Sequence, residues 1–188
     1  MSTQLSNAVP YADDEMYVTK RSGEREIVSF DKILKRIKTI GLEANIKINY
    51  TALVMKVIDQ LYNNISTTKI DELSAEQCAA MSSIHTDYNI LAGRIIVSNH
   101  LKNTSSSFSE TMKQLYLYKD KHNNHSPLIS QELYNIVLKY DEERSDGIFT
   151  LFTTNKLDSI INYNREFLID YFGFKTLERA YLMRINKK

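Results

Sequence analysis

The feature that most constrains the fold is a change in the residue pattern near residue 30, from short β-prone runs to apolar residues at helical spacing. Two short β-prone runs, residues 16–21 and 24–30, flank the pair Ser22-Gly23. Such runs around a Ser-Gly turn predict a β-hairpin. Directly afterwards, apolar residues recur at the spacing of one helical face. This stripe consists of Ile33, Leu34, Ile37 and Ile40. The hairpin is therefore expected to lead straight into an amphipathic helix.

Further apolar periodicity predicts a helical bundle in the first hundred residues. Ser29 or Asp31 can cap the first helix, which ends near Gly41. The run 66–70 is short and β-prone, so we expect it to form a third strand beside the hairpin. The four helices are expected at about residues 31–41, 50–65, 71–83 and 88–105. These elements predict an α+β fold, mainly α, in which a three-stranded sheet caps a four-helix bundle.

After residue 105 the sequence becomes harder to place. Residues 108–118 and 130–140 read as helices, joined by a polar loop that holds His122, His125 and Pro127. Residues 141–156 give no clear pattern. A short helix is expected at 156–162, whereas 177–185 fits either a strand or a helix.

Composition excludes several function classes. The net charge is +1, and a binder of duplex nucleic acid usually carries a large excess of Lys and Arg. Cys78 is the single cysteine of the chain, so no internal disulfide or dithiol is possible, and its small-residue surroundings predict a packing role. No apolar run has the length of a membrane span, and the polar, acidic first residues do not resemble a targeting peptide. We expect a cytoplasmic protein without nucleic-acid or membrane partners.

A net charge close to zero still permits binding of a small anion, and a few residues are candidates for contacting it. Lys20 and Arg21 stand beside the predicted glycine turn, where they could meet a polyphosphate. Lys32 lies in the first helical turn, where a cation opposes the helix dipole unless it faces an anion. Thr67 and Asp71 could contact a phosphate and a ribose hydroxyl. Each also has a simpler interpretation: exposed basic residues on a hairpin, a surface lysine, and Asp71 as a helix cap.

Other kinds of site find no support in the residue pattern. The glycines are scattered and form no phosphate-binding loop of the Walker type. The four histidines, His85, His100, His122 and His125, lack the spacing of metal ligands. No nucleophile-base arrangement and no pair of catalytic carboxylates can be identified from spacing.

Two groups of motifs resemble known proteins. The run 18–23, followed by Glu26, Val28 and residues 30–33, is similar to the start of an ATP-cone, the nucleotide-sensing domain of many ribonucleotide reductases. Residues 67–73 and 87–95 continue that resemblance in order. Further on, residues 125–127 and 171–182 resemble the segments that lead into the catalytic barrel of class I large subunits.

The resemblance implies a domain organisation. It places an ATP-cone regulatory domain at 16–105 and an incomplete helical part of the large-subunit domain at 106–188. Residues 1–15, which carry Pro10 and a small acidic cluster, are expected to form a flexible leader. The family's chemistry uses several cysteine thiols in a barrel that the matching segments do not reach. The resemblance therefore implies a non-catalytic piece of a longer ribonucleoside-diphosphate reductase.

The resemblance also implies a ligand and its contacts. The effector would be ATP or dATP, together with Mg²⁺, and no metal would be bound by the protein itself. Phosphate contacts are implied for Lys20, Arg21, Lys32, Thr67 and Lys102. Glu26 would lie near the base, Val18 and Ile70 beside the adenine, and Asp71 at the ribose.

The implied role is allosteric control of the reduction of ribonucleotides to deoxyribonucleotides for DNA synthesis. The partners would be the rest of the large subunit, other large subunits in a dimer or higher oligomer, and the radical-generating small subunit. Two alternatives stay open. The cone could have lost its ligand and serve as an assembly module, or the chain could be a nucleotide-responsive transcriptional regulator, although such a regulator carries a zinc ribbon ahead of its cone.

Overall fold

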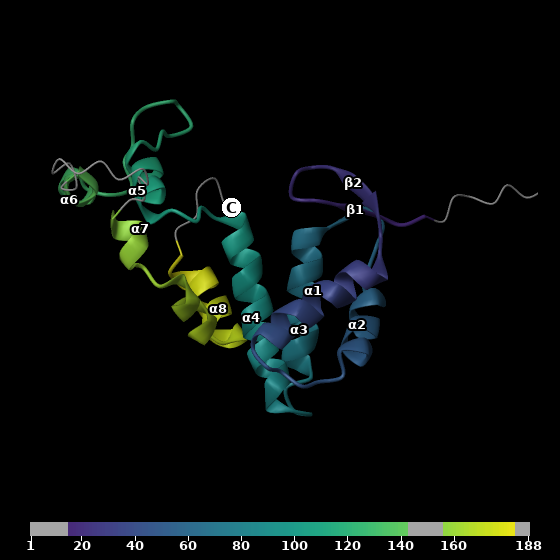
Figure 1. Cartoon of the computed structure of the whole chain (residues 1–188). Coiled ribbons are helices and arrows are strands. Elements are labelled where there is room, and N and C mark those ends of the chain that lie inside the picture. The colour runs from purple at the N-terminus through teal and green to yellow at the C-terminus, as the bar shows by residue number, and fades with distance from the viewer. Residues whose placement is uncertain (1–14, 143–155, 183–188) are drawn as a thin grey trace, which may run out of the picture. The chain divides into compact units, whose positions relative to one another are not determined.

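The computed structural model describes residues 15–142 and 156–182 (Figure 1). These residues form two compact units. The first unit contains residues 15–96 and 170–182, and the second contains residues 97–142 and 156–169. The fold is α+β and mainly helical, with a single three-stranded sheet among the described residues, as the sequence predicts. The boundary between the units falls within a helix, earlier than the domain boundary expected at residue 105.

A hairpin and one short strand form the sheet of the first unit. Its strands are β1 (Tyr17–Thr19), β2 (Arg25–Ile27) and β3 (Ile65–Ser66), in the order β2-β1-β3. In the antiparallel β1–β2 pair, Val18 stands opposite Glu26, and in the parallel β1–β3 pair it stands opposite Ile65. Gly23 has a φ of 88°, which the predicted turn requires and which glycine adopts without strain. The predicted hairpin is confirmed.

The third strand is shorter than expected, and a helix begins inside the predicted strand. Strand β3 ends at Ser66, and Thr67 is the first residue of α3 (Thr67–Ala80). The Ser66 hydroxyl accepts a hydrogen bond from the Lys69 backbone N–H at 3.1 Å, which caps the helix. The predicted third strand beside the hairpin is confirmed, but its predicted range of 66–70 is wrong, because the Ser66 cap starts a helix within this β-prone run.

Besides α3, three helices contribute to the N-terminal part of the first unit. Helix α1 (Phe30–Glu43) has Ser29 as its cap, one of the two caps that the sequence predicts. Helix α2 (Tyr50–Ile58) is shorter than the predicted 50–65, because the following residues carry the chain to the sheet, where Asn64 N–H donates to the Tyr17 carbonyl at 2.8 Å. Helix α4 (Thr86–Asn103) is divided between the two units, and its residues 86–96 belong to the first unit.

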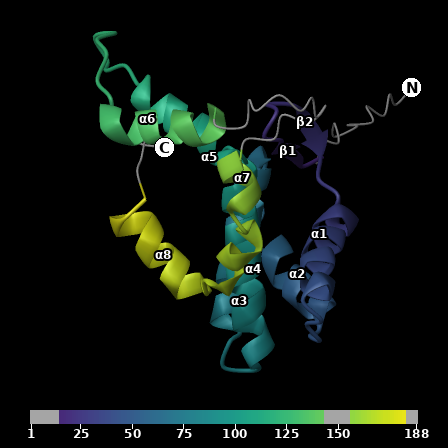
Figure 2. The ribbon, with the colours of Figure 1, turned by 60° about the vertical axis from the view of Figure 1, so that its left-hand side comes forward.

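The core of the first unit lies between these helices. Of the predicted stripe on α1, Ile33, Ile37 and Ile40 are buried. Helix α1 packs on α2, and α2 packs on α3. In both views the β1–β2 hairpin lies at the same end of α1 and α2 (Figures 1 and 2). The largest fully buried side chains of this unit are Ile37, Leu53, Val57, Ile65, Ser74, Cys78, Leu91 and Ile95. Burial of this apolar surface stabilises the packed helices that support the hairpin.

Helix α8 (Tyr171–Ala180) completes the first unit. Its N-terminus is capped by Asp170, whose carboxylate accepts from the Gly173 backbone N–H at 2.7 Å. The segment that fits either a strand or a helix begins at residue 177, so its first residues belong to this helix and its last three lie outside the described residues. Tyr171 is buried, and burial is the main cause that raises the pKa of its phenol.

The second unit is helical. It contains the end of α4, then α5 (Phe108–Tyr116), α6 (Gln131–Glu142), α7 (Lys156–Ile160) and the 3₁₀ helix η1 (Tyr163–Leu168). The expected helices near 108–118, 130–140 and 156–162 are confirmed within a few residues, whereas η1 was not predicted. The unplaced segment 141–156 lies mostly outside the described residues. No helix in the described ranges is long and apolar enough to cross a membrane.

Asp158 holds the second unit together at the start of α5. Its carboxylate accepts hydrogen bonds from the Ser107 hydroxyl at 2.7 Å and from the backbone N–H groups of Phe108 and Ser109 at 2.6 and 3.3 Å. These are N–H groups that the helix leaves without a partner of its own. A residue about fifty positions further along the chain thus fixes the first turn of α5 and ties it to α7.

The packing role that the sequence predicts for Cys78 is confirmed. The side chain is fully buried in α3, and desolvation raises the pKa of the thiol to about 12. Thiolate is the reactive form, so very little is present at neutral pH. We expect the native chain to resist alkylation by iodoacetamide at pH 8, and the urea-unfolded chain to react fully. Rapid labelling of the native chain, followed by mass spectrometry, would contradict this burial.

Candidate functional site

The β1–β2 hairpin and the start of α1 bring three of the predicted residues together around one carboxylate. Glu26 on β2 lies 2.7 Å from Lys20 Nζ through Oε2, and its Oε1 accepts from Lys32 Nζ. Lys20 also pairs with Glu24 at 3.4 Å. We refer to Lys20, Glu24, Glu26 and Lys32 as the lysine cluster. The hairpin turn brings Lys20 back over β2, while Ser29 starts the helix that carries Lys32.

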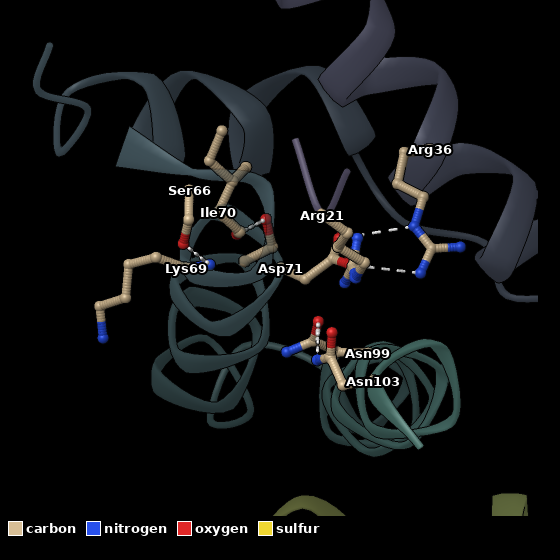
Figure 3. A network of polar contacts seen from close by, with 9 residues as sticks. Arg21, Arg36, Ser66, Lys69, Ile70, Asp71, Asn99 and Asn103 are labelled. Atoms are coloured by element: carbon tan, nitrogen blue, oxygen red, sulfur yellow. Dashed lines mark hydrogen bonds and ion pairs between the residues drawn. The ribbon is translucent and has the colours of Figure 1, made fainter. Parts of the chain in front are cut away.

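A second group gathers around Asp71 on α3. The Arg21 guanidinium lies 3.2 Å from Asp71 Oδ2. Arg36 on α1 makes two contacts, Nε to Oδ1 at 3.4 Å and a terminal nitrogen to Oδ2 at 3.3 Å. Figure 3 shows both arginine side chains turned toward the carboxylate. We refer to Arg21, Arg36 and Asp71 as the arginine cluster.

The arginine cluster is the more buried of the two. The Asp71 side chain is only 8% exposed, and each arginine side chain is less than one third exposed. By contrast, the Lys32 side chain is 69% exposed. A buried carboxylate is retained at low cost only when cations and hydrogen bonds replace the water it has lost. Asp71 is therefore held firmly by its arginines, whereas the more exposed lysines can exchange their glutamate partners for an anion from solvent.

The two clusters are linked through the backbone. Lys20 and Arg21 are neighbours after β1, and Lys32 and Arg36 are four residues apart on α1, so they share one face of that helix. Together the clusters hold four cations against three carboxylates. This arrangement leaves one net positive charge on a surface built from the hairpin and two helices. Such a surface attracts an anion with several negative charges.

The start of α3 adds neutral groups beside the arginine cluster. Thr67 is the first residue of α3, and Ile70 and Asp71 follow within its first two turns. Val18 and Ile70 are both buried, at 8% and 7% exposure. The alternative in which Asp71 caps this helix is wrong, since Ser66 occupies the cap and Asp71 pairs with the arginines instead. The free N–H groups and dipole of a helix start favour a bound anion.

The structure thus brings some of the nine predicted residues into direct ion pairs with one another, but not all of them. Lys20, Glu26 and Lys32 form one cluster, and Arg21 and Asp71 belong to the other. Lys102 lies near the end of α4, in the second unit, and its part in the site stays a prediction. Arg36 was missed from the sequence. Its position four residues after Lys32 was the available signal, but its partner lies 35 positions away and no local pattern reveals it.

The simpler interpretation of the basic residues as solvated surface charges is wrong for Arg21, which pairs with a buried carboxylate. Lys20 and Lys32 are more exposed, but both pair with Glu26 rather than extending singly into solvent. Across the described ranges, no three His, Cys, Asp or Glu side chains gather in a way that could hold a metal ion. What the site offers is a set of cations and N–H donors suited to a polyphosphate ligand.

Comparison with known proteins agrees with this geometry. Residues 16–103 match the family described as the ATP cone domain. That range contains both clusters and the start of α3, as well as Lys102 on α4.

Whole proteins with a similar sequence are named ribonucleoside-diphosphate reductase large subunit. The protein from Dictyostelium discoideum is 45% identical over 194 aligned positions, which cover 100% of this chain and 21% of that protein. The proteins from Variola virus and Caenorhabditis elegans are 44% and 41% identical, and each alignment covers 92% of this chain. This chain spans about one fifth of the length of these relatives. The similarity extends past the ATP cone into the helices of the second unit.

Proposed function

Because the chain belongs to the family of ribonucleotide reductase large subunits and carries its N-terminal ATP cone, we propose that its first unit binds ATP or dATP as an allosteric effector. The observation that carries this proposal is the gathering of Lys20, Arg21 and Lys32 on one surface beside the start of α3. A triphosphate would replace Glu26 as the partner of the two lysines. Charge-assisted hydrogen bonds to phosphate are strong enough to compete with exposed ion pairs.

We assign the parts of the nucleotide as follows. Lys20, Lys32 and the Arg21 guanidinium take the phosphates, with Thr67 at the helix start as a hydroxyl donor. Asp71 accepts from the ribose. Val18 and Ile70 form the apolar surface beside the adenine, and Glu26 accepts from the base once the lysines have turned to the phosphates. Lys102 is proposed as a further phosphate ligand.

Magnesium would arrive with the triphosphate. Mg²⁺ usually keeps several water ligands and binds through substrate phosphates rather than in a cage made by the protein. The described carboxylates nearest the lysines, Glu24 and Glu26, are engaged by those lysines. We therefore propose that the ion neutralises phosphate charge without a dedicated protein site.

The proposed role is regulation of a reductase rather than catalysis by this chain. Cys78 is buried in α3 and its thiol pKa is raised, so it supplies little of the nucleophilic thiolate. ATP and dATP differ by one hydroxyl, so a switch between them needs contacts that differ at the ribose. We propose that the occupied cone changes how this region associates with the remaining large subunit, with other large subunits and with the small subunit.

The test is thermal unfolding of the 188-residue chain with magnesium and either ATP, dATP or CTP. A ligand that binds the folded state alone stabilises it by about 2.7 kcal/mol at one hundred times its Kd. We expect ATP and dATP to raise the melting temperature in a saturable way, and CTP to act much more weakly. Identical unfolding with and without millimolar adenine nucleotide would contradict the proposed function and favour a cone kept only for assembly.

A further inference from the structure

Asp71 is held by two guanidinium groups, although one would neutralise its charge. Arg21 contacts a single carboxylate oxygen, whereas Arg36 contacts both. We propose that Arg36 is a positioning residue, which fixes the orientation of the Asp71 carboxylate and thereby sets how the site tells ribose from deoxyribose. This inference rests on the proposed function, because it assumes that a nucleotide occupies the site. Arg36 itself is assigned no contact with the ligand.

The hydrogen bonds around Asp71 leave one oxygen incompletely used. Oδ2 accepts from Arg21 and from a terminal nitrogen of Arg36, at 3.2 and 3.3 Å. Oδ1 accepts from Arg36 Nε at 3.4 Å. A carboxylate offers about two acceptor positions on each oxygen. Among the described residues, therefore, Oδ1 is the oxygen with an acceptor position left for a ribose hydroxyl.

The two-point contact of Arg36 is what fixes that position. A carboxylate held through one oxygen can rotate about its bond to the β-carbon, and the remaining acceptor then points in several directions. The planar fork of Arg36 contacts both oxygens at once, which restricts this rotation. Lysine carries the same charge but offers a compact ammonium group on a flexible stem, so it cannot reproduce the fork. Replacement of Arg36 by lysine therefore keeps the positive charge beside Asp71 but removes the two-point contact that orients the carboxylate.

The position of Arg36 suits this role. It lies on α1, one turn after Lys32, while Asp71 lies on α3, so the contact joins two helices that both border the site. The Arg36 side chain is 27% exposed and the Asp71 side chain 8% exposed, so water competes weakly for the pair. A ligand placed by the lysine cluster would thus meet an acceptor whose direction is already set before it binds.

The experiment is calorimetry on the 188-residue chain and its Arg36→Lys variant with ATP, 2′-deoxy-ATP and 3′-deoxy-ATP. We expect the variant to bind ATP about three- to tenfold more weakly, the range typical of losing one hydrogen bond of ordinary strength. The loss should disappear for one deoxy analogue, the one that lacks the hydroxyl accepted by Asp71. Lys38→Ala, on another face of α1, is the matched control and should leave all three affinities unchanged.

A double-mutant cycle shows whether Arg36 acts through Asp71. In an Asp71→Asn background, Arg36→Lys should change none of the three affinities further, because the acceptor it positions is gone. Arg36→Gln serves as a second variant if Arg36→Lys does not fold, with far-UV circular dichroism as the check. Equal weakening of all three nucleotides, or no weakening of any, would overturn the inference while leaving nucleotide binding intact. Absence of binding by the unsubstituted chain would instead overturn the proposed function, and this inference with it.

Discussion

Replacement of both Lys20 and Lys32 by alanine is expected to weaken ATP binding by about 100-fold. Each lysine should contribute about tenfold, since a hydrogen bond to a charged group is worth about 1.5 kcal/mol or more. The double variant also leaves Glu26 without its two cations, and its negative charge would then repel the phosphates. The measurement is calorimetry with ATP and magnesium at fixed salt, because these interactions are screened by ions.

Two comparisons make that result specific. Lys38→Ala removes a charge from another face of α1 and should leave the affinity unchanged within twofold. The free energy of unfolding of the double variant should change by less than about 1 kcal/mol, because exposed ion pairs contribute little to stability. An unchanged affinity for ATP in the double variant would show that the lysine cluster is not where the phosphates bind.

Replacement of Gly41 by valine is expected to lower the free energy of unfolding by about 2–3 kcal/mol. Gly41 is buried near the end of α1, and a Cβ at this position would meet the ring of Tyr50, with Cε1 at 2.7 Å and Cζ at 2.8 Å. The ring cannot turn away freely, since the Tyr50 hydroxyl donates to the Ile46 carbonyl at 2.7 Å. Urea denaturation followed by circular dichroism measures the change.

The Tyr50→Leu background provides the matched control for this clash. With the ring removed, Gly41→Val should cost less than about 1 kcal/mol, because no atom then occupies the position of the added side chain. An equally large cost in both backgrounds would place the strain elsewhere, for instance at the helix end, where the Gly41 carbonyl accepts from the Ile46 backbone N–H at 2.9 Å. The result would show how closely α1 and α2 must approach to support the hairpin.

The parts of the fold that the sequence predicts correctly are those with local signals. A Ser-Gly pair between β-prone runs and a serine ahead of an apolar stripe are sufficient for the hairpin and α1. The error at 66–70 has a local cause as well. Ser66 both ends β3 and caps α3. The β propensity averaged over residues 66–70 does not reveal that the structure changes from strand to helix within this run. The early start of α8 depends on the Asp170 cap, a signal that was present but not used.

The site is less predictable than the fold because its contacts are not local. Arg21 and Asp71 are 50 positions apart, and Arg36 and Asp71 are 35 apart. Single residues can be nominated from motifs, and the ATP-cone resemblance nominates Asp71 for the ribose. The presence of Arg36 behind Asp71 follows only from the tertiary arrangement in which α1 and α3 each pack on α2. Residues that orient a ligand-binding group, rather than contact the ligand, are the ones that motif reading misses.

In the proposed complex, cations from the hairpin and α1, together with the start of α3, receive one adenine nucleotide. The most direct test is a titration of the ¹⁵N-labelled chain with ATP, followed by the backbone amide signals. We expect saturable shifts concentrated at residues 18–26, 32–36 and 67–71, with one common Kd. Saturable shifts confined to α5, α6 and the loop between them, or no shifts at millimolar ATP, would contradict it.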